Sequence, residues 1–153
     1  MKFHRLQMSR PFDIWKHSTN DGKGNLTKIV FEYDLPSNDC IFSDVKHIFV
    51  TRSLADVLSK EGFTGYSLSP VITTYSDSYP NLQKQDPVWL LEVSGAHGVD
   101  DFGMLTPTIL IVSEKVLSVI KLHGSDDVKV FDYDPNYRHP VPDWLLNDDD
   151  AEE

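Results

Sequence analysis

A chain of 153 residues with 40% hydrophobic and 25% charged side chains has the composition of an ordinary globular protein, which excludes a disordered or fibrous class. Its one cysteine, Cys40, excludes a disulfide framework and a zinc site built from cysteines. The sequence contains no stretch with the pattern of a signal peptide or of a membrane span, so we expect a protein of the reducing cytoplasm.

The formal net charge of −10 is unevenly distributed. Residues 148–153 hold five acidic and no basic side chains, which leaves 19 acidic and 14 basic residues, or −5, for the rest. We therefore expect one α+β domain over residues 1–146 and a disordered acidic tail over 147–153. The acidic balance disfavours nucleic acid and anionic membranes as partners, because both require a basic surface, and it favours a basic protein.

Strands are expected from the first residues onward. Alternating or β-branched and aromatic side chains predict seven of them, at residues 2–8, 28–34, 48–50, 66–74, 88–93, 110–112 and 128–131. The first is expected at the edge of a sheet, and Pro70 also indicates an edge or a bulge because proline has no N–H. Val88 to Val93 is strongly apolar and predicts a central strand, followed by a glycine-rich loop at 94–103.

One pattern occurs twice, at a constant offset of 62 positions, in residues 48–62 and 110–124. Each copy has an apolar run, then a hydroxyl residue (Thr51 or Ser113), then apolar residues at helical spacing, then a glycine. Serine and threonine cap helix starts, and glycine takes the left-handed conformation that ends helices. The expected buried stripes are Leu54, Val57 and Leu58 in the first helix and Val116, Val119 and Ile120 in the second.

These signals predict an α+β fold with a mixed β-sheet of about six or seven strands and two main helices. The helices belong to two strand–helix–strand units, which either share one sheet or face each other. We expect positive φ angles at Gly62 and Gly124, since both follow a helix directly.

The stretch most typical of an enzyme is His97-Gly-Val-Asp100-Asp101, a histidine and two carboxylates on a glycine-rich loop. It could serve a metal-assisted hydrolase, but no second histidine lies at ligand spacing, and aspartates in such loops commonly cap backbone N–H groups. Cys40 with His47 lacks a third group to orient the histidine. We therefore expect a protein without catalytic residues, metal or cofactor, with the metal-assisted hydrolase as the alternative.

A partner protein needs a structured contact surface, and four aspartates are the candidates for it. Asp100, Asp101, Asp126 and Asp127 lie in expected loops next to strand or helix ends. A patch of this kind would steer a basic partner electrostatically. The alternative is that the same four side chains cap turns.

Residues Ile48 to Val71 and Ile111 to Ile120 resemble the immunity-protein families of bacterial polymorphic toxin systems. In those families an apolar strand ending in Val-Ser or Val-Thr leads into a helix, a glycine and a strand with a Pro-Val pair. Some relatives carry paired Cys-x-x-Cys zinc motifs, which this chain lacks, so the resemblance implies no metal here. It implies a cytoplasmic, non-enzymatic protein that binds and blocks one cognate toxin. A subunit of a larger assembly is a third possibility.

Overall fold

The computed structural model describes residues 2–8, 12–13, 19–20, 26–44, 47–106 and 108–140. Within these ranges the chain forms two α-helices, one 3₁₀ turn and thirteen strands in four sheets. The predicted α+β class is therefore confirmed. The strands are more numerous than the sequence indicated, and they divide among several sheets instead of forming one mixed sheet.

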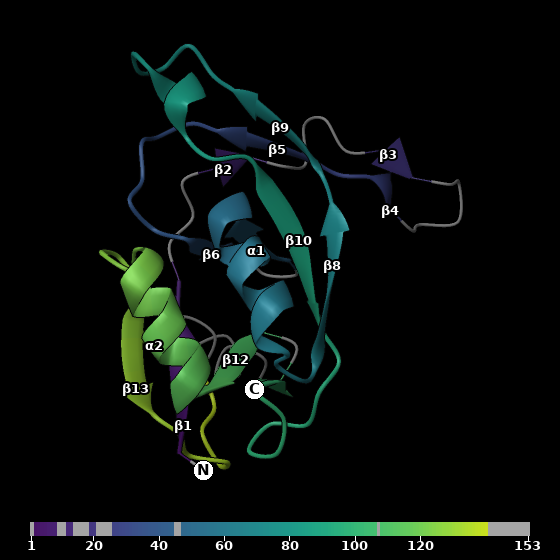
Figure 1. Cartoon of the computed structure of the whole chain (residues 1–153), viewed down its shortest axis with the longest axis vertical. Coiled ribbons are helices and arrows are strands. Elements are labelled where there is room, and N and C mark those ends of the chain that lie inside the picture. Colours follow the sequence, from purple (N-terminus) through teal and green to yellow (C-terminus); the bar gives the residue numbers. More distant parts are fainter. Residues whose placement is uncertain are drawn as a thin grey trace, which may run out of the picture.

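Two four-stranded antiparallel sheets carry the two helices (Figure 1). The first sheet has the order β11 (Phe102–Thr106), β12 (Ile109–Ser113), β1 (Phe3–Gln7), β13 (Lys129–Asp132), and its helix is α2 (Glu114–His123). The second has the order β6 (Ile41–Ser43), β7 (Ile48–Thr51), β10 (Val88–Val93), β8 (Tyr66–Pro70), and its helix is α1 (Arg52–Glu61). Each predicted unit thus has a sheet of its own.

The two sheets share their topology and their register. In each, the strand before the helix and the strand after it pair with one antiparallel strand between them. Thr51 lies opposite Val88 and Leu68 opposite Leu91 in the second sheet. In the first sheet, Ser113 lies opposite Phe3 and Val130 opposite Leu6. The offset of 62 positions between the units therefore extends from the capping residue to the following strand.

The prediction that residues 2–8 form an edge strand is wrong. β1 lies between β12 and β13, in the position that β10 occupies in the second sheet. A strand–helix–strand unit whose two strands are parallel and one position apart leaves a gap for an antiparallel strand. The N-terminal strand fills that gap, although its own imperfect alternation is typical of an edge.

Two smaller sheets complete the described chain: β2 (Phe12–Asp13), β5 (Val30–Tyr33) and β9 (Ile72–Tyr75) form one, and β3 (Thr19–Asn20) and β4 (Leu26–Lys28) the other. The predicted strands at 28–34 and 66–74 are each divided. The second of these changes sheets after Pro70, where β8 ends at the edge that Pro70 indicated. A 3₁₀ turn, η1 (Leu82–Lys84), follows β9, and β11 begins inside the predicted loop 94–103.

The predicted helix ends are confirmed. The Thr51 hydroxyl accepts a hydrogen bond from the Leu54 N–H at 3.4 Å, and the Ser113 hydroxyl accepts one from the Val116 N–H at 3.3 Å. Gly62 and Gly124 cap the opposite ends with φ angles of 69° and 125°. Both helices therefore start and stop at the residues whose chemistry predicts it.

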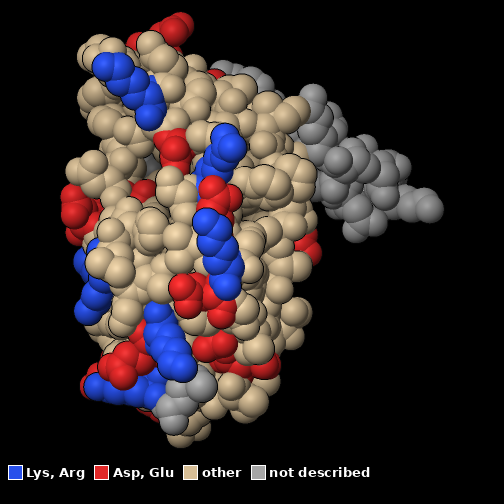
Figure 2. Space-filling view, in the orientation of Figure 1, with Lys and Arg blue, Asp and Glu red and all other residues tan. Residues whose placement is uncertain are grey.

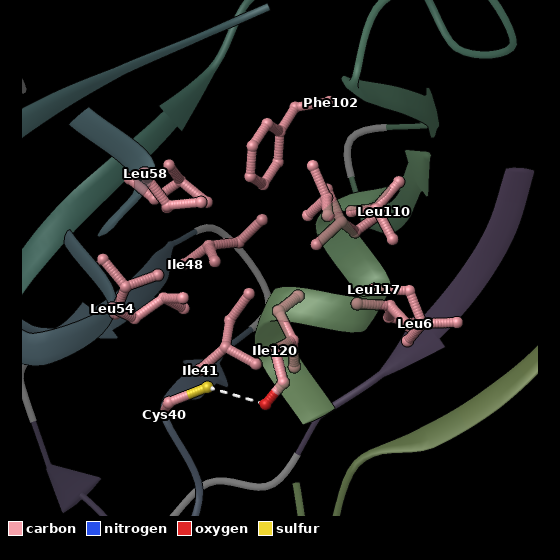
Figure 3. Packing of buried hydrophobic residues seen from close by; sticks show 14 of the residues in the cluster. Leu6, Cys40, Ile41, Ile48, Leu54, Leu58, Phe102, Leu110, Leu117 and Ile120 are labelled. Carbon is pink, nitrogen blue, oxygen red and sulfur yellow. Dashed lines mark hydrogen bonds between the residues drawn. The ribbon is translucent and has the colours of Figure 1, made fainter. Parts of the chain in front are cut away.

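One hydrophobic core joins both helices and both four-stranded sheets (Figure 3). Leu54 and Leu58 of α1 meet Leu117 and Ile120 of α2, and the two helices lie side by side (Figure 1). The expected stripes need one correction. Ala55 and Leu117 are buried, whereas Val57 and Val119 are only partly buried, at equivalent positions in the two helices. Each helix therefore turns its buried face toward its partner helix as well as its own sheet.

A second, mainly aromatic cluster covers the other face of the β7–β10 sheet. Its buried members are Phe31, Tyr33, Phe42, Phe49, Leu82, Val88 and Leu90. Phe31 packs edge-on against Phe49 at 5.1 Å between ring centroids, and the Tyr33 hydroxyl donates to the Asp86 carbonyl at 2.8 Å. The second sheet is thus covered on both faces.

None of the helices in the described ranges is long and apolar enough to cross a membrane. The acidic tail lies outside the described residues. The division into a domain over 1–146 and a tail over 147–153 accordingly stays a prediction.

Candidate interaction surface

Asp100 stabilises its own loop. Its carboxylate accepts a hydrogen bond from the Ala96 N–H at 2.8 Å, and its backbone N–H donates to the Ala96 carbonyl at 2.9 Å. The chain therefore turns tightly between β10 and β11. This is the capping role that loop aspartates commonly have and that was the alternative to a partner-binding role.

Asp101 connects the two strand–helix–strand units. One carboxylate oxygen accepts from the Thr64 N–H at 3.0 Å, in the segment between α1 and β8. The other accepts from the hydroxyl of Ser113, the capping residue of α2, at 2.8 Å. Because charge-assisted hydrogen bonds are stronger than neutral ones, this carboxylate ties the segment after α1 firmly to the start of α2.

Asp126 and Asp127 lie just after α2, and both side chains are exposed. The Asp126 carboxylate accepts from the Asn38 side-chain amide at 3.1 Å. The backbone N–H of Asp127 donates a hydrogen bond to the Asp39 carboxylate at 2.9 Å. No hydrogen bond of the Asp127 carboxylate itself occurs within the described residues, which makes it the freest of the four candidates.

The structure does not bring the four aspartates into one patch. Asp101 binds the capping residue of α2, and Asp126 and Asp127 follow the other end of that helix. A ten-residue helix is about 15 Å long, so two separate acidic pairs result. Figure 2 also shows Lys and Arg interspersed with Asp and Glu over the face that carries the helices. The predicted surface is therefore smaller and more mixed in sign than a single acidic patch.

His97 does not converge with the neighbouring carboxylates. Its Nδ1 lies 2.7 Å from the Tyr133 hydroxyl, and the two rings meet edge-on at 5.9 Å. Tyr133 also packs edge-on against Phe3 at 5.9 Å, so the contact fastens the segment after β13 to β1 and to the His97 loop. In the described part of the chain, no group of three or more His, Cys, Asp or Glu side chains is placed to hold a metal ion.

Cys40 and His47 have different surroundings. Cys40 is buried in the core, and its thiol donates to the Ile120 carbonyl with Sγ and O 3.5 Å apart (Figure 3). His47 instead lies against Asp44, with Nδ1 3.3 Å from the carboxylate. Burial raises the pKa of the Cys40 thiol from 9.0 to about 12. Since the thiolate is the nucleophile, this cysteine is suited to packing and not to catalysis.

We expect Cys40 to react with iodoacetamide at neutral pH at least about a hundredfold more slowly in the folded protein than in urea, because burial blocks access and suppresses the thiolate. Mass spectrometry of the alkylated chain measures this difference in rate. Rapid stoichiometric labelling of the folded protein would contradict the buried position.

The raised pKa of Cys40 also predicts a pH dependence of stability. Between pH 9 and about 12 the unfolded chain loses the thiol proton while the folded chain keeps it, so stability falls as the pH rises through this window.

A pocket of about 290 Å³, which no sequence pattern indicated, lies at the end of β1. It is lined by Arg5, Leu6, Gln7, Met8, Ser43, Thr108, Ile109, Tyr137, His139 and Pro140. Residues from four distant parts of the sequence meet there, so no local motif marks the site. The one signal available was an arginine at the centre of the predicted N-terminal strand.

Comparison with known proteins adds no assignment: no protein-family model matches the chain, and no curated protein is significantly similar to it.

Proposed function

We propose that this chain is a non-enzymatic interaction protein, specifically an immunity protein that binds and neutralises a cognate bacterial toxin. The resemblance of residues 48–71 and 111–120 to immunity-protein families motivates the proposal. The main support for it is that the side chains best suited to catalysis are hydrogen-bonded within the protein itself. His97 binds Tyr133, Asp100 binds its own loop, and Asp101 links Thr64 to Ser113, so these side chains serve structure.

The same contacts weaken the alternative of a metal-assisted hydrolase. General-base or metal chemistry requires the acting side chains to converge on one reacting atom. Here the histidine and the two carboxylates have different partners. Cys40 offers no nucleophile either, since burial raises its pKa to about 12.

Neutralisation requires rapid capture of a toxin inside the cell that makes it. Acidic side chains on a protein surface accelerate encounter with a basic partner, and salt reduces this effect. Asp126 and Asp127 are exposed and lie together after α2, so they are the best placed of the candidate aspartates for this contact. A substitution at Asp101 would not test this contact cleanly, because its carboxylate has structural partners at Thr64 and Ser113.

The proposal predicts that expression of the chain protects cells against the toxin encoded beside its gene. Reversing the two charges with Asp126→Lys and Asp127→Lys should slow association with the purified toxin by about tenfold or more at low salt, because the steering charge changes sign. Association rates from surface plasmon resonance measure this. Asp77→Lys, at an exposed position after β9, is the matched control and should change the rate little.

These experiments test the proposed immunity function and the proposed contact surface separately. Absence of protection by the intact chain would refute the immunity proposal. Protection and association that survive the reversals at 126 and 127 would instead refute the choice of surface. Amide substitution of the five acidic residues in 148–153 gives the third arm, and we expect it to leave protection intact because salt screens charges on a tail of the predicted kind.

A further inference from the structure

The pocket at the end of β1 is basic in a protein that is acidic overall. Arg5 and His139 are among its lining residues, and among the residues that the structure describes no aspartate or glutamate lines it. Polar side chains capable of hydrogen bonding also surround it, from Gln7, Ser43 and Thr108. The chain as a whole has 24 acidic residues against 14 Lys and Arg, so the pocket lining has the opposite sign of charge from the rest of the protein.

Arg5 is held by aromatic rings. Its guanidinium carbon lies 4.1 Å from the ring centroid of Phe131 and 3.7 Å from that of Tyr137. Tyr137 is itself positioned by His139, whose Nδ1 lies 3.3 Å from the tyrosine hydroxyl. Cation–π contacts use the face of each ring and leave the N–H groups at the guanidinium rim to bind other partners.

Within the described ranges no carboxylate pairs with Arg5, and its side chain makes no hydrogen bond there. Arg5 is partly buried, and the five N–H groups of its guanidinium are strong donors that stay accessible to an arriving acceptor. The two rings restrict the side chain without satisfying these donors. Arg5 is therefore oriented in advance for an acceptor that comes from elsewhere.

The equivalence between the two units shows that Arg5 departs from the shared pattern. Arg5 lies opposite Ile111, and the equivalent pair in the second sheet is Leu90 opposite Phe49. Leu90 and Phe49 are themselves buried members of the aromatic cluster that covers the second sheet. The second unit forms the shared topology with leucine at this position, so that topology does not by itself require an arginine.

From this geometry we infer that the pocket binds a small oxyanion, a carboxylate or a phosphate, through the guanidinium of Arg5. A guanidinium fork matches the two oxygens of either group, and hydroxyl and amide side chains from Ser43, Thr108 and Gln7 can complete the site. A volume of about 290 Å³ is at the lower limit for ligand pockets, which suits a side-chain-sized anion and not a nucleotide. This inference does not depend on the immunity proposal.

The test uses the full chain with succinate and inorganic phosphate as probes and uncharged succinamide as the control, measured by calorimetry. We expect both anions to bind, succinamide to bind at least about tenfold more weakly, and affinity for the anions to fall with added salt. Arg5→Gln should lower anion affinity by about tenfold or more, and Arg5→Lys, which keeps the charge but not the fork, should fall between the two.

Amide NMR spectra of the unaltered protein supply a second readout that does not require the variants to fold. Shifts at Gln7, Thr108 and His139 on addition of phosphate support the site, and shifts confined to other residues overturn it. Equal affinity of the unaltered protein and Arg5→Gln, with both folded, also overturns it. A full-length variant with amides in place of the five acidic residues at 148–153 identifies the source: tighter phosphate binding by this variant that persists at high salt, where long-range charge effects are screened, indicates that the tail carboxylates compete for the same pocket.

Discussion

Ile120→Ala is expected to lower the free energy of unfolding by about 2–5 kcal/mol, the usual cost of truncating a fully buried large aliphatic side chain. Ile120 is 0% exposed and lies on α2 where the two helices meet (Figure 3). Its backbone carbonyl also accepts a hydrogen bond from the Cys40 thiol. The substitution leaves a cavity that both units border, so neither sheet can close it without losing packing of its own. Urea denaturation followed by circular dichroism measures the change.

Leu122→Ala is the matched control on the same helix. Leu122 is 84% exposed, two residues from Ile120, and its truncation should change stability by no more than about 0.5 kcal/mol. Equal denaturation midpoints for Ile120→Ala and the unaltered protein would show that the helical stripe is assigned to the wrong face.

Gly124→Ala should cost more than about 3 kcal/mol, beyond the usual cost of backbone strain alone. At φ 125° an L-residue is strained, and a Cβ at this position would lie 2.0 Å from the Asn38 carbonyl oxygen. That carbonyl belongs to the segment leading into β6. Two residues further along this segment, the Cys40 N–H donates a hydrogen bond to the Gly124 carbonyl at 3.0 Å. The methyl group therefore forces apart two backbone segments that are hydrogen-bonded to each other. Thermal or urea unfolding gives the measurement.

Gly62→Ala, the equivalent change after α1, separates the two causes. Gly62 also has a positive φ, 69°, but no atom lies within 4 Å of where its Cβ would be. We expect this variant to lose only about 1–2 kcal/mol, the cost of the left-handed conformation. If the two glycine variants were equally stable, the close approach of Asn38 to Gly124 would be refuted.

The candidate site was only partly predictable. The capping alternative for Asp100 and Asp101 was visible in the sequence because loop aspartates commonly bind backbone N–H groups near them in the chain. The bridge from Asp101 to Thr64 and Ser113 was not, since it joins two segments that only the packing of the units brings together. The Arg5 pocket was missed for the same reason: Arg5 and Tyr137 are at opposite ends of the chain.

Local chemistry determined both helices. Thr51 and Ser113 accept hydrogen bonds from N–H groups three residues on, and Gly62 and Gly124 act at the residue they occupy, so the helix limits follow from neighbours within one turn. The α+β class follows from the same signals together with the apolar runs before each cap. These interactions form over short stretches of chain, and a linear pattern of side chains is enough to predict them.

Tertiary packing decided the place of β1, the change of sheets after Pro70 and the separation of the acidic pairs. β1 is interior because β12 and β13 are held one strand apart by α2, and the gap offers unpaired N–H and C=O groups to an N-terminal strand that is far away in sequence. Strand pairing of this kind is specified by both partners at once. The alternation within one strand can indicate that it pairs, but only the folded arrangement determines its two neighbours.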